Sequence, residues 1–494
     1  MIRTRFAPDG TLSAHGSVAA LALATLLASL GTSIANVALP TLALSFGASF
    51  QEVQWVALAY LLAVTGLIVS VGRLGDMIGR RRLLLAGLAL FTVASSLCAV
   101  APTLPLLIAG RAVQGLGAAI MMALALAFVA EAVPRARVGA AMGLLGTTSA
   151  IGTALGPSLG GLLVSGFGWR SIFLVNLPLG LVAMVMAYGS LAPDPKASAR
   201  ERVRFDVTGT VLLAATLIAY ALATTIGRGS FGMLNAVFLG AAVCGGGAFV
   251  LAETKVASPL VRFGIFRQPA IGAGVITSLV VATVIMATLV VGPFYLSRAL
   301  GLDAALVGLV MTAGPLVAAL AGIPSGRAVD RFGAEPMTSV GLGAIATGAL
   351  LLSALPARLG VGGYVAPLAI MTAGYALFQA ANNTAVMRDV EADQRGVVSG
   401  VLNLSRNLGL VTGASVMGAV FAAAVGTGDV VAARPELVAG GMRATFALAA
   451  VLVFVAFVAA SAYRRYLPPP GSAACPAKLS ANRVAAPHAS GSPR

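Results

Sequence analysis

Long apolar runs of about 20 residues recur along almost the whole chain, and short polar segments separate them. A helix needs about 20 apolar residues to cross roughly 30 Å of hydrocarbon, whereas a barrel strand needs about 10 residues of alternating polarity. No such alternation is visible, so the pattern predicts membrane-spanning helices. The fourteen expected spans cover roughly 16–39, 53–72, 83–101, 104–130, 139–163, 170–191, 206–226, 233–252, 270–296, 305–325, 337–357, 362–386, 397–424 and 443–463.

Composition supports this interpretation. Hydrophobic residues make up 59% of the 494 residues and charged residues only 10%, against about 25% charged in a soluble domain. A water-soluble chain this apolar could not cover its surface with polar groups. In lipid that demand disappears, provided that helices satisfy the backbone hydrogen bonds. We therefore expect an all-α polytopic membrane protein whose surroundings are a lipid bilayer.

The basic residues are unevenly distributed between the two ends of the expected spans. With the N-terminus inside, 24 of the 32 Lys and Arg residues fall on the cytoplasmic side, six outside and two within spans. Cytoplasmic loops of membrane proteins carry such an excess. We expect a multi-pass protein of a bacterial-type inner membrane with both termini cytoplasmic. The net charge of +16 then reflects an anionic membrane surface rather than a nucleic-acid partner.

Residues typical of enzyme or metal sites are scarce. The three cysteines, Cys98, Cys244 and Cys475, are scattered, and His15 and His488 lie at opposite ends. No metal-ligand spacing, nucleophile–base pair or phosphate-binding loop is visible. We therefore expect no catalytic activity, no metal and no organic cofactor. We also expect that transport is not driven by ATP.

A loop motif repeats within the chain. Residues 72–82 read GRLGDMIGRRR and residues 326–333 read GRAVDRFG, so that Gly-Arg-x-x-Asp-x-x-Gly recurs at an offset of 254 residues. The same offset relates the start of the first span to that of the ninth. This predicts two six-helix bundles with two inserted helices, a common plan for transporters with a central site. The expected division is 1–15 N-terminus, 16–191 first bundle, 192–269 linker with the inserted helices, 270–466 second bundle and 467–494 disordered cytoplasmic tail.

Two further segments have unusual chemistry for membrane spans. Residues 111–119 read RAVQGLGAA, and an Arg at bilayer depth costs about 2.5–3.5 kcal/mol on insertion scales, so it is expected to face a polar cavity. The alternative is an Arg that bonds helix carbonyls. Residues 143–161 read GLLGTTSAIGTALGPSLGG, with glycines at four-residue spacing that allow close approach of a neighbouring helix.

Together these segments resemble the major facilitator superfamily, in particular its fourteen-helix drug:proton antiporter branch. The resemblance implies a latch in the loop after span 2, in which Asp76 meets the start of span 13 near Gly396; the alternative is a solvated basic turn. It also implies a role of Arg111 in proton coupling and of the glycine-rich segment as an antiporter motif. The residues so assigned are Gly72, Asp76, Gly79, Arg80 and Asp330 for the latch, Arg111, Gln114 and Glu131 for coupling or the cavity, and Gly152, Gly156, Pro157 and Gly160 for packing.

The chain departs from that branch in its first span. The branch commonly carries an Asp five residues before the Asn of NVALP, and here Gly31 stands there. A counterpart of the antiporter motif is also missing near Leu410, where the repeat offset would place it. With no acidic residue near the middle of the membrane, we expect neutral, amphipathic or anionic substrates.

Polar residues within spans are costly and therefore mark functional sites. We expect a central cavity between the bundles, although any single Asn could equally make an ordinary interhelical hydrogen bond. Its candidate residues are Ser29, Ser33, Asn36, Tyr60, Gln379, Asn382, Asn383, Asn403, Arg406 and Asn407.

The sequence as a whole predicts a secondary-active efflux transporter that exports small amphipathic or drug-like molecules, with protons as the coupling ion, and that works as a monomer. The alternatives are a facilitator or exporter of a specific metabolite without proton coupling, and a transporter-like membrane sensor. No loop is long enough for a signalling domain, which disfavours the sensor.

Overall fold

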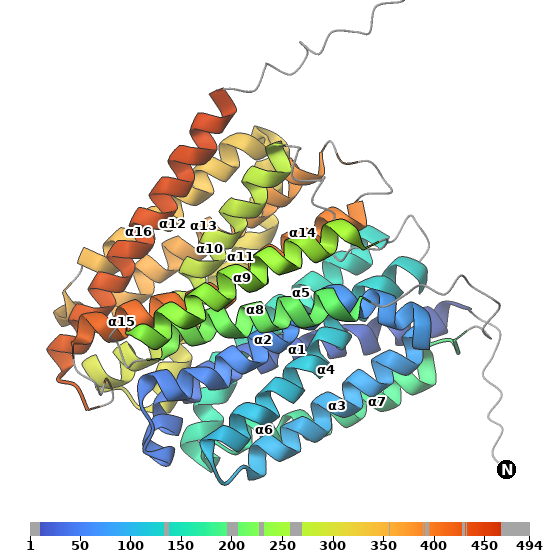
Figure 1. The fold of residues 1–494 in the computed structure, drawn as a ribbon, viewed down its shortest axis with the longest axis horizontal. Helices are drawn as coiled ribbons and strands as arrows, with labels where there is room; N and C mark the ends of the chain where they lie inside the picture. The colour runs from blue at the N-terminus through green and yellow to red at the C-terminus, as the bar shows by residue number, and fades with distance from the viewer. Residues whose placement is uncertain are drawn as a thin grey trace, which may run out of the picture.

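The computed structural model describes residues 10–132, 138–194, 206–226, 232–256, 269–354, 356–388, 390, 395–426, 430 and 432–465. Helices form nearly all of this part of the chain (Figure 1). They are α1 Gly10–Phe46, α2 Phe50–Ile78, α3 Arg80–Val100, α4 Leu104–Ala132, α5 Val138–Phe167, α6 Ser171–Leu174, α7 Asn176–Ser190, α8 Val207–Thr225, α9 Met233–Lys255, α10 Pro269–Phe294, η3 Tyr295–Ala299, α11 Ala304–Phe332, α12 Ala334–Ala354, η4 Ala357–Leu359, α13 Gly360–Met387, α14 Arg395–Thr412, η5 Gly413–Met417, α15 Gly418–Val425 and α16 Pro435–Arg465.

The helices agree with the predicted membrane spans. Among the described residues, thirteen helical segments are long and apolar enough to cross a bilayer. The remaining predicted span is α5, which has 30 residues and contains the shorter apolar stretch Ile151–Phe167. Two predicted spans are interrupted: η3 continues α10 as a π-helix, and η5 inserts a π-helical turn between α14 and α15. Hydropathy does not distinguish π-helical from α-helical turns, so neither was predicted.

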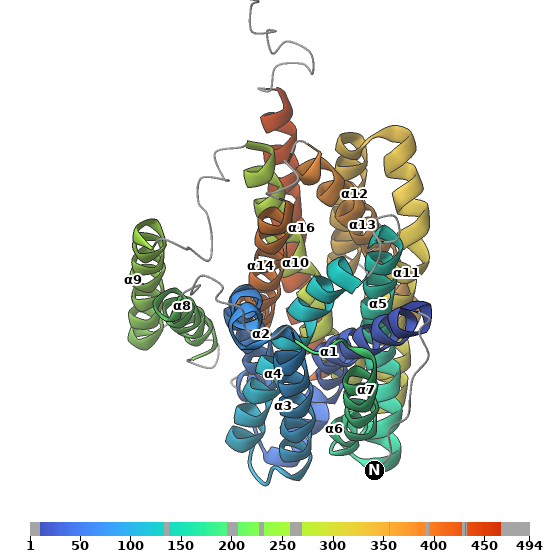
Figure 2. The same ribbon diagram turned by 90° about the vertical axis from the view of Figure 1, so that its right-hand side faces the viewer.

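The helices gather into two bundles with a separate pair beside them (Figure 2). Helices α1–α7 pack together, as do α10–α16. Helix α8 runs beside α2, where the hydroxyls of Ser70 and Thr210 lie 2.7 Å apart and Trp55 Nε1 donates to Thr225 Oγ1 at 3.2 Å. Helix α9 packs on α8 and exposes large apolar side chains such as Met233, Val243 and Leu251, as expected for a helix that faces lipid.

Helix packing repeats at the same offset as the loop motif. In the first bundle a Cβ on Gly87 of α3 would lie 2.8 Å from Ile120 Cβ of α4; 254 residues later, a Cβ on Gly341 of α12 would lie 2.7 Å from the Phe378 nitrogen of α13. At both positions the neighbouring helix comes so close that only glycine fits. The repeat therefore extends from the loops into the bundle cores.

The antiporter-motif glycines also have a counterpart. A Cβ on Gly152 of α5 would lie 2.6 Å from the Leu26 carbonyl of α1, and a Cβ on Gly160 would lie 3.0 Å from the Ile34 carbonyl. In the second bundle, Cβ atoms on Gly409 of α14 and Gly413 of η5 would overlap carbonyls of α10. The sequence near Leu410 has no Gly-Pro pattern, as noted above, and Gly409 and Gly413 lie one residue before the positions that the offset of 254 gives for Gly156 and Gly160.

Candidate functional site

The two bundles meet at the ends that carry the α1–α2, α5–α6 and α10–η3 turns. Phe50, at the start of α2, packs edge-on against Phe294 of α10 and Phe421 of α15, with ring centroids 4.7 and 5.3 Å apart. All three side chains are fully buried. An aromatic cluster of this kind excludes solvent, so this end of the interface between the bundles is closed.

Two further contacts across the interface are related by the repeat. On one side, Gly161 of α5 crosses Gly308 of α11, where a Cβ on Gly161 would lie 2.9 Å from Gly308 Cα. On the other side, Gln54 of α2 donates from Nε2 to the carbonyl of Ala414 in the π-helical turn η5. Gln54 and Gly308 differ by the repeat offset of 254. One pseudosymmetric contact thus uses glycine packing and the other an amide side chain.

Away from the aromatic seal formed by Phe50, Phe294 and Phe421, the second bundle contains a polar cavity of about 170 Å³. It lies among α10, α13 and the first half of α14, towards the ends of these helices remote from Phe294. Its lining residues are Ser278, Gln379, Asn383, Met387, Leu402, Asn403 and Arg406.

Four of the predicted cavity residues come together there. Gln379, Asn383, Asn403 and Arg406 all line the cavity. Gln379 Nε2 donates to the Tyr375 hydroxyl at 2.8 Å, one turn earlier in α13, which holds its amide in place. The guanidinium of Arg406 makes no ion pair within the described part of the chain, and its Nε is buried without an acceptor. The cavity therefore presents one uncompensated positive charge among hydrogen-bonding side chains.

The other predicted cavity residues of the first bundle are buried elsewhere. Ser33, Asn36 and Tyr60 are fully buried, and the Tyr60 hydroxyl donates to the Ala28 carbonyl at 2.7 Å. Asn36 Nδ2 donates to the Thr32 carbonyl of its own helix at 3.2 Å. In this conformation the described structure does not bring these side chains to the cavity, because α1 and α2 turn them into the first bundle.

In the second bundle, Asn382 and Asn407 are likewise buried beside the cavity rather than in its wall. Asn382 Nδ2 donates to the Gly274 carbonyl at 3.1 Å, which ties α13 to α10. This is the ordinary interhelical hydrogen bond that the sequence left open as an alternative. Asn383, the next residue, lines the cavity instead.

Arg111 does not face a polar cavity in this structure, although the sequence predicted that it would. It is 1% exposed and lies within the first bundle. Its Nε donates to the Val56 carbonyl at 2.9 Å and Nη1 to Gln114 Oε1 at 2.6 Å, while its guanidinium carbon stacks 4.2 Å from the Tyr60 ring centroid. Gln114 Nε2 continues to Ser95 Oγ at 2.6 Å. Arg111 thus connects α2, α3 and α4, which corresponds to the structural alternative that the sequence allowed.

Gly31 lies in a tightly packed position in the same region. A Cβ there would lie 3.3 Å from the Phe91 ring and 3.3 Å from the Tyr60 hydroxyl. A longer side chain would have to displace one of these two rings. In the fourteen-helix branch this position commonly carries an Asp. Here the side chains of Phe91 and Tyr60 take up the space that an Asp side chain would need.

The loop between α2 and α3 is held by a residue that the sequence did not single out. Asp194, after the end of α7, accepts hydrogen bonds from the backbone nitrogens of Arg81 at 2.9 Å and Arg82 at 3.1 Å. The carboxylate thereby caps the N-terminus of α3, where partial positive charge favours an anion. One sequence signal could have identified Asp194: it is an acidic residue that follows a span, on the same side of the membrane as an arginine-rich turn.

Gly79 makes this cap possible. Its φ is 104°, a conformation that L side chains rarely adopt, and a Cβ there would lie 2.6 Å from Asp194 Cγ.

Asp330, in the repeated loop, is exposed at the end of α11. The side chains of Asp76 and Glu131, and the surroundings of Gly72, lie outside the described residues, so the predicted latch contact near Gly396 stays a prediction. Arg80 is half-buried beside the loop.

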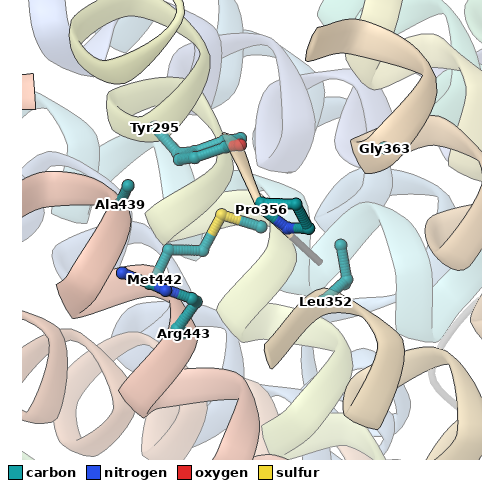
Figure 3. A pocket seen from close by; sticks show the side chains of 7 residues that line it. All are labelled: Tyr295, Leu352, Pro356, Gly363, Ala439, Met442 and Arg443. Carbon is teal, nitrogen blue, oxygen red and sulfur yellow. The ribbon is translucent and has the colours of Figure 1, made fainter. Parts of the chain in front are cut away.

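A second hollow in the molecule is too small to hold a solute (Figure 3). It lies in the second bundle between η3, α12, α13 and α16, and its volume of about 10 Å³ is at or below the size needed for one water. Figure 3 shows Tyr295, Met442 and Pro356 around it. The 170 Å³ cavity is therefore the better candidate site.

Comparison with known proteins agrees with this architecture. The sequence model of the Major Facilitator Superfamily matches residues 21–414, and the chain belongs to that family of membrane transporters. The multidrug resistance protein Stp of Mycobacterium tuberculosis (strain ATCC 25618 / H37Rv) is 32% identical over 374 residues, which cover 75% of this chain and 69% of Stp.

Two other similarities are informative. The riboflavin transporter RibZ of Clostridioides difficile (strain 630) is 30% identical over 377 residues, which cover 75% of this chain and 80% of RibZ. The crystal structure of a bacterial homologue of the human lysosomal transporter Spinster superposes with a TM-score of 0.66 at 16% identity, covering 91% of this chain and 96% of that one. The latter likeness concerns the fold. The chain is thus a multi-pass membrane transporter of small molecules.

Proposed function

We propose that this protein is a proton-coupled exporter of small amphipathic or drug-like molecules that works by alternating access. The observation that supports this most is the difference between the two ends of the molecule. The aromatic cluster of Phe50, Phe294 and Phe421 closes the interface between the bundles at one end, whereas the polar cavity lies within the second bundle towards the other end. A single site accessible from one side at a time is what alternating access requires.

The charge distribution supports an assignment of the two ends to the two sides of the membrane. Of the 32 basic residues, 24 flank the ends that carry the termini. By the positive-inside rule these ends are cytoplasmic, and the aromatic seal is extracellular. The conformation is then inward-facing, with a cavity that can load solute from the cytoplasm. The export direction is supported by relatives such as Stp, whose name refers to multidrug resistance.

A proton-coupled exporter needs a carboxylate that binds and releases protons, because Arg does not titrate usefully in proteins. Gly31 removes the usual position, which leaves the peripheral carboxylates Asp76, Glu131 and Asp206 as candidates. Asp206 is buried at the start of α8, where Oδ1 accepts from the Gly209 nitrogen at 2.7 Å and Oδ2 has no partner among the described residues. Glu253 lies nearby, since both carboxylates approach the position of a Gly209 Cβ.

The driving force is sufficient for export. A membrane potential of 100 mV supplies about 2.3 kcal/mol per charge, which sustains a gradient of roughly fifty-fold for a neutral solute at about 1.4 kcal/mol per tenfold. One proton per solute would therefore support drug resistance without ATP.

An efflux assay tests this proposal. The chain is expressed in a bacterial host that lacks its major efflux pumps, and antibiotic susceptibility is measured with an empty vector as the control. We expect resistance to a subset of amphipathic compounds and its loss when an ionophore collapses the proton gradient at constant ATP. Efflux that persists under the ionophore would replace proton antiport by a facilitator or another coupling ion.

RibZ favours a second candidate, export of a specific metabolite. Riboflavin is the first compound to test for this alternative. Accumulation of riboflavin in the medium without any change in antibiotic susceptibility would favour it over multidrug export.

A further inference from the structure

Arg406 has an environment unlike that of the other intramembrane arginine. Arg111 donates to two acceptors and stacks on Tyr60, with only its Nη2 left unpaired, whereas no ion pair or hydrogen bond within the described part of the chain satisfies Arg406. Arg406 is half-buried, and its Nε is wholly removed from solvent. A buried donor without an acceptor is unfavourable, and at Arg406, which lines a cavity, a ligand can supply the acceptor.

The cavity around Arg406 supplies further polar groups. Ser278 of α10, Asn383 of α13 and Asn403 of α14 face the same space of about 170 Å³. Amide and hydroxyl groups can donate to the oxygens of an anion, and the planar guanidinium pairs with a carboxylate through two parallel hydrogen bonds. Within the described part of the chain, no acidic side chain lines the cavity, so a ligand can neutralise the positive charge.

The cavity wall also has an apolar part. Met387 of α13 and Leu402 of α14 line the same space as the polar groups. Methionine adapts to flat or irregular apolar ligands because its side chain is flexible and polarizable. The wall thus fits a molecule with one anionic group and an apolar, planar body.

We propose that this cavity binds amphipathic organic anions, with Arg406 as the residue that holds the carboxylate or equivalent group. The inference rests on the proposed transport function and specifies its substrate class. A cation placed there would face Arg406 without a counter-charge, and an uncharged amide would form weaker hydrogen bonds. The order of affinity is therefore anion, then neutral isostere, then cation.

Binding to the purified protein in nanodiscs tests this order without any ion gradient. The probes are 2-naphthoate, 2-naphthamide and 2-naphthylmethylammonium, which share a ring system and differ in charge. We expect 2-naphthoate to bind at least tenfold more tightly than 2-naphthamide, which corresponds to about 1.4 kcal/mol, and the ammonium to bind least. Equal affinities, a preference for the ammonium, or no measurable binding of any probe would overturn the proposal.

Matched variants test whether Arg406 causes the preference for the anionic probe. Arg406→Gln should abolish the preference for 2-naphthoate over 2-naphthamide, whereas Arg406→Lys should retain part of this preference. Arg434→Gln removes an exposed arginine before α16 in the same bundle and should leave the preference intact. If the preference survives in Arg406→Gln, Arg406 is not the anion-binding residue.

Two controls keep the outcomes separate. Thermal unfolding in detergent verifies that Arg406→Gln folds as the wild type does, so that loss of binding is not loss of structure. The binding assay contains no proton gradient, so failure of proton coupling does not affect it. Conversely, proton-driven efflux of neutral or cationic drugs by a protein without anion preference would refute this inference and leave the transport function standing.

Discussion

The two bundles repeat the same architecture but treat their polar groups differently. In the first bundle, Arg111, Gln114 and Ser95 form a buried chain of hydrogen bonds that links three helices. In the second, Arg406, Asn383 and Asn403 surround a cavity. The first arrangement stabilises a scaffold, and the second leaves binding capacity for a solute. An intramembrane arginine is therefore informative about function only once its partners are known.

The repeat makes the difference concrete. The position equivalent to Arg406 in the first bundle is Gly152, which lets α5 approach the backbone of α1 closely. At that point the first bundle is packed tightly and the second is hollow. A site built in one half of a repeated fold needs only a few such replacements, because the helices themselves keep their places.

The largest expected effect separates the two arginines by stability. Arg111→Ala should lower the free energy of unfolding by about 3 kcal/mol, because it removes the hydrogen bonds to Gln114 Oε1 and the Val56 carbonyl in the core and creates a cavity. Arg406→Ala should change it by less than about 0.5 kcal/mol, since Arg406 has no partner to lose. Unfolding in detergent, followed by heat or by SDS, measures both. Equal losses in the two variants would contradict the comparison.

An intermediate effect distinguishes the two repeated turns. Gly79 and Gly333 have φ values of 104° and 88°, so alanine is strained at both, by about 1–3 kcal/mol. At Gly79 the new methyl group would also displace Asp194, whereas the nearest atom at Gly333 is Pro336 Cδ at 3.7 Å. Gly79→Ala should therefore destabilise the protein by about 1 kcal/mol more than Gly333→Ala, the usual contribution of a helix cap.

A double variant checks the cause of that difference. When Asp194→Ala has already removed the cap, Gly79→Ala and Gly333→Ala should destabilise the protein equally. A difference that persists in the Asp194→Ala background would show that Asp194 is not its source.

The helical fold was predictable because lipid imposes a simple rule: each span needs about 20 apolar residues. The loop motif, recurring at Asp76 and Asp330, was sufficient to predict the repeat of the bundles. The environment of Arg111 was not predictable, because its acceptor at Val56 is a backbone carbonyl of another helix. Insertion cost indicates that such a residue needs partners but does not say whether they are protein or solute.

The candidate cavity was predictable in part for the same reason. Polar type alone selected Asn382 and Asn383 equally, although they point in directions about 100° apart on the helix. Spacing gave a better signal: Gln379 and Asn383 are four residues apart and share a face, as do Asn403 and Arg406 at three. Both pairs line the cavity. Which face of α13 meets the cavity depends on packing against α10, which the sequence does not encode locally.

The smallest expected effect concerns these two adjacent asparagines. Asn382→Ala should lower the free energy of unfolding by about 1 kcal/mol, because it removes the hydrogen bond to the Gly274 carbonyl and leaves that buried carbonyl without this donor. Asn383→Ala should be neutral in stability, because Asn383 is exposed to the cavity and water can replace its amide. In transport the order should reverse, with Asn383→Ala weakening the apparent affinity for solute and Asn382→Ala leaving it close to that of the wild type. Unfolding in detergent and uptake into inside-out vesicles, measured on the same two preparations, provide both orders. If Asn382→Ala proved neutral in stability, or weakened solute affinity more than Asn383→Ala, the boundary drawn here between the structural and solute-facing sides of α13 would be wrong.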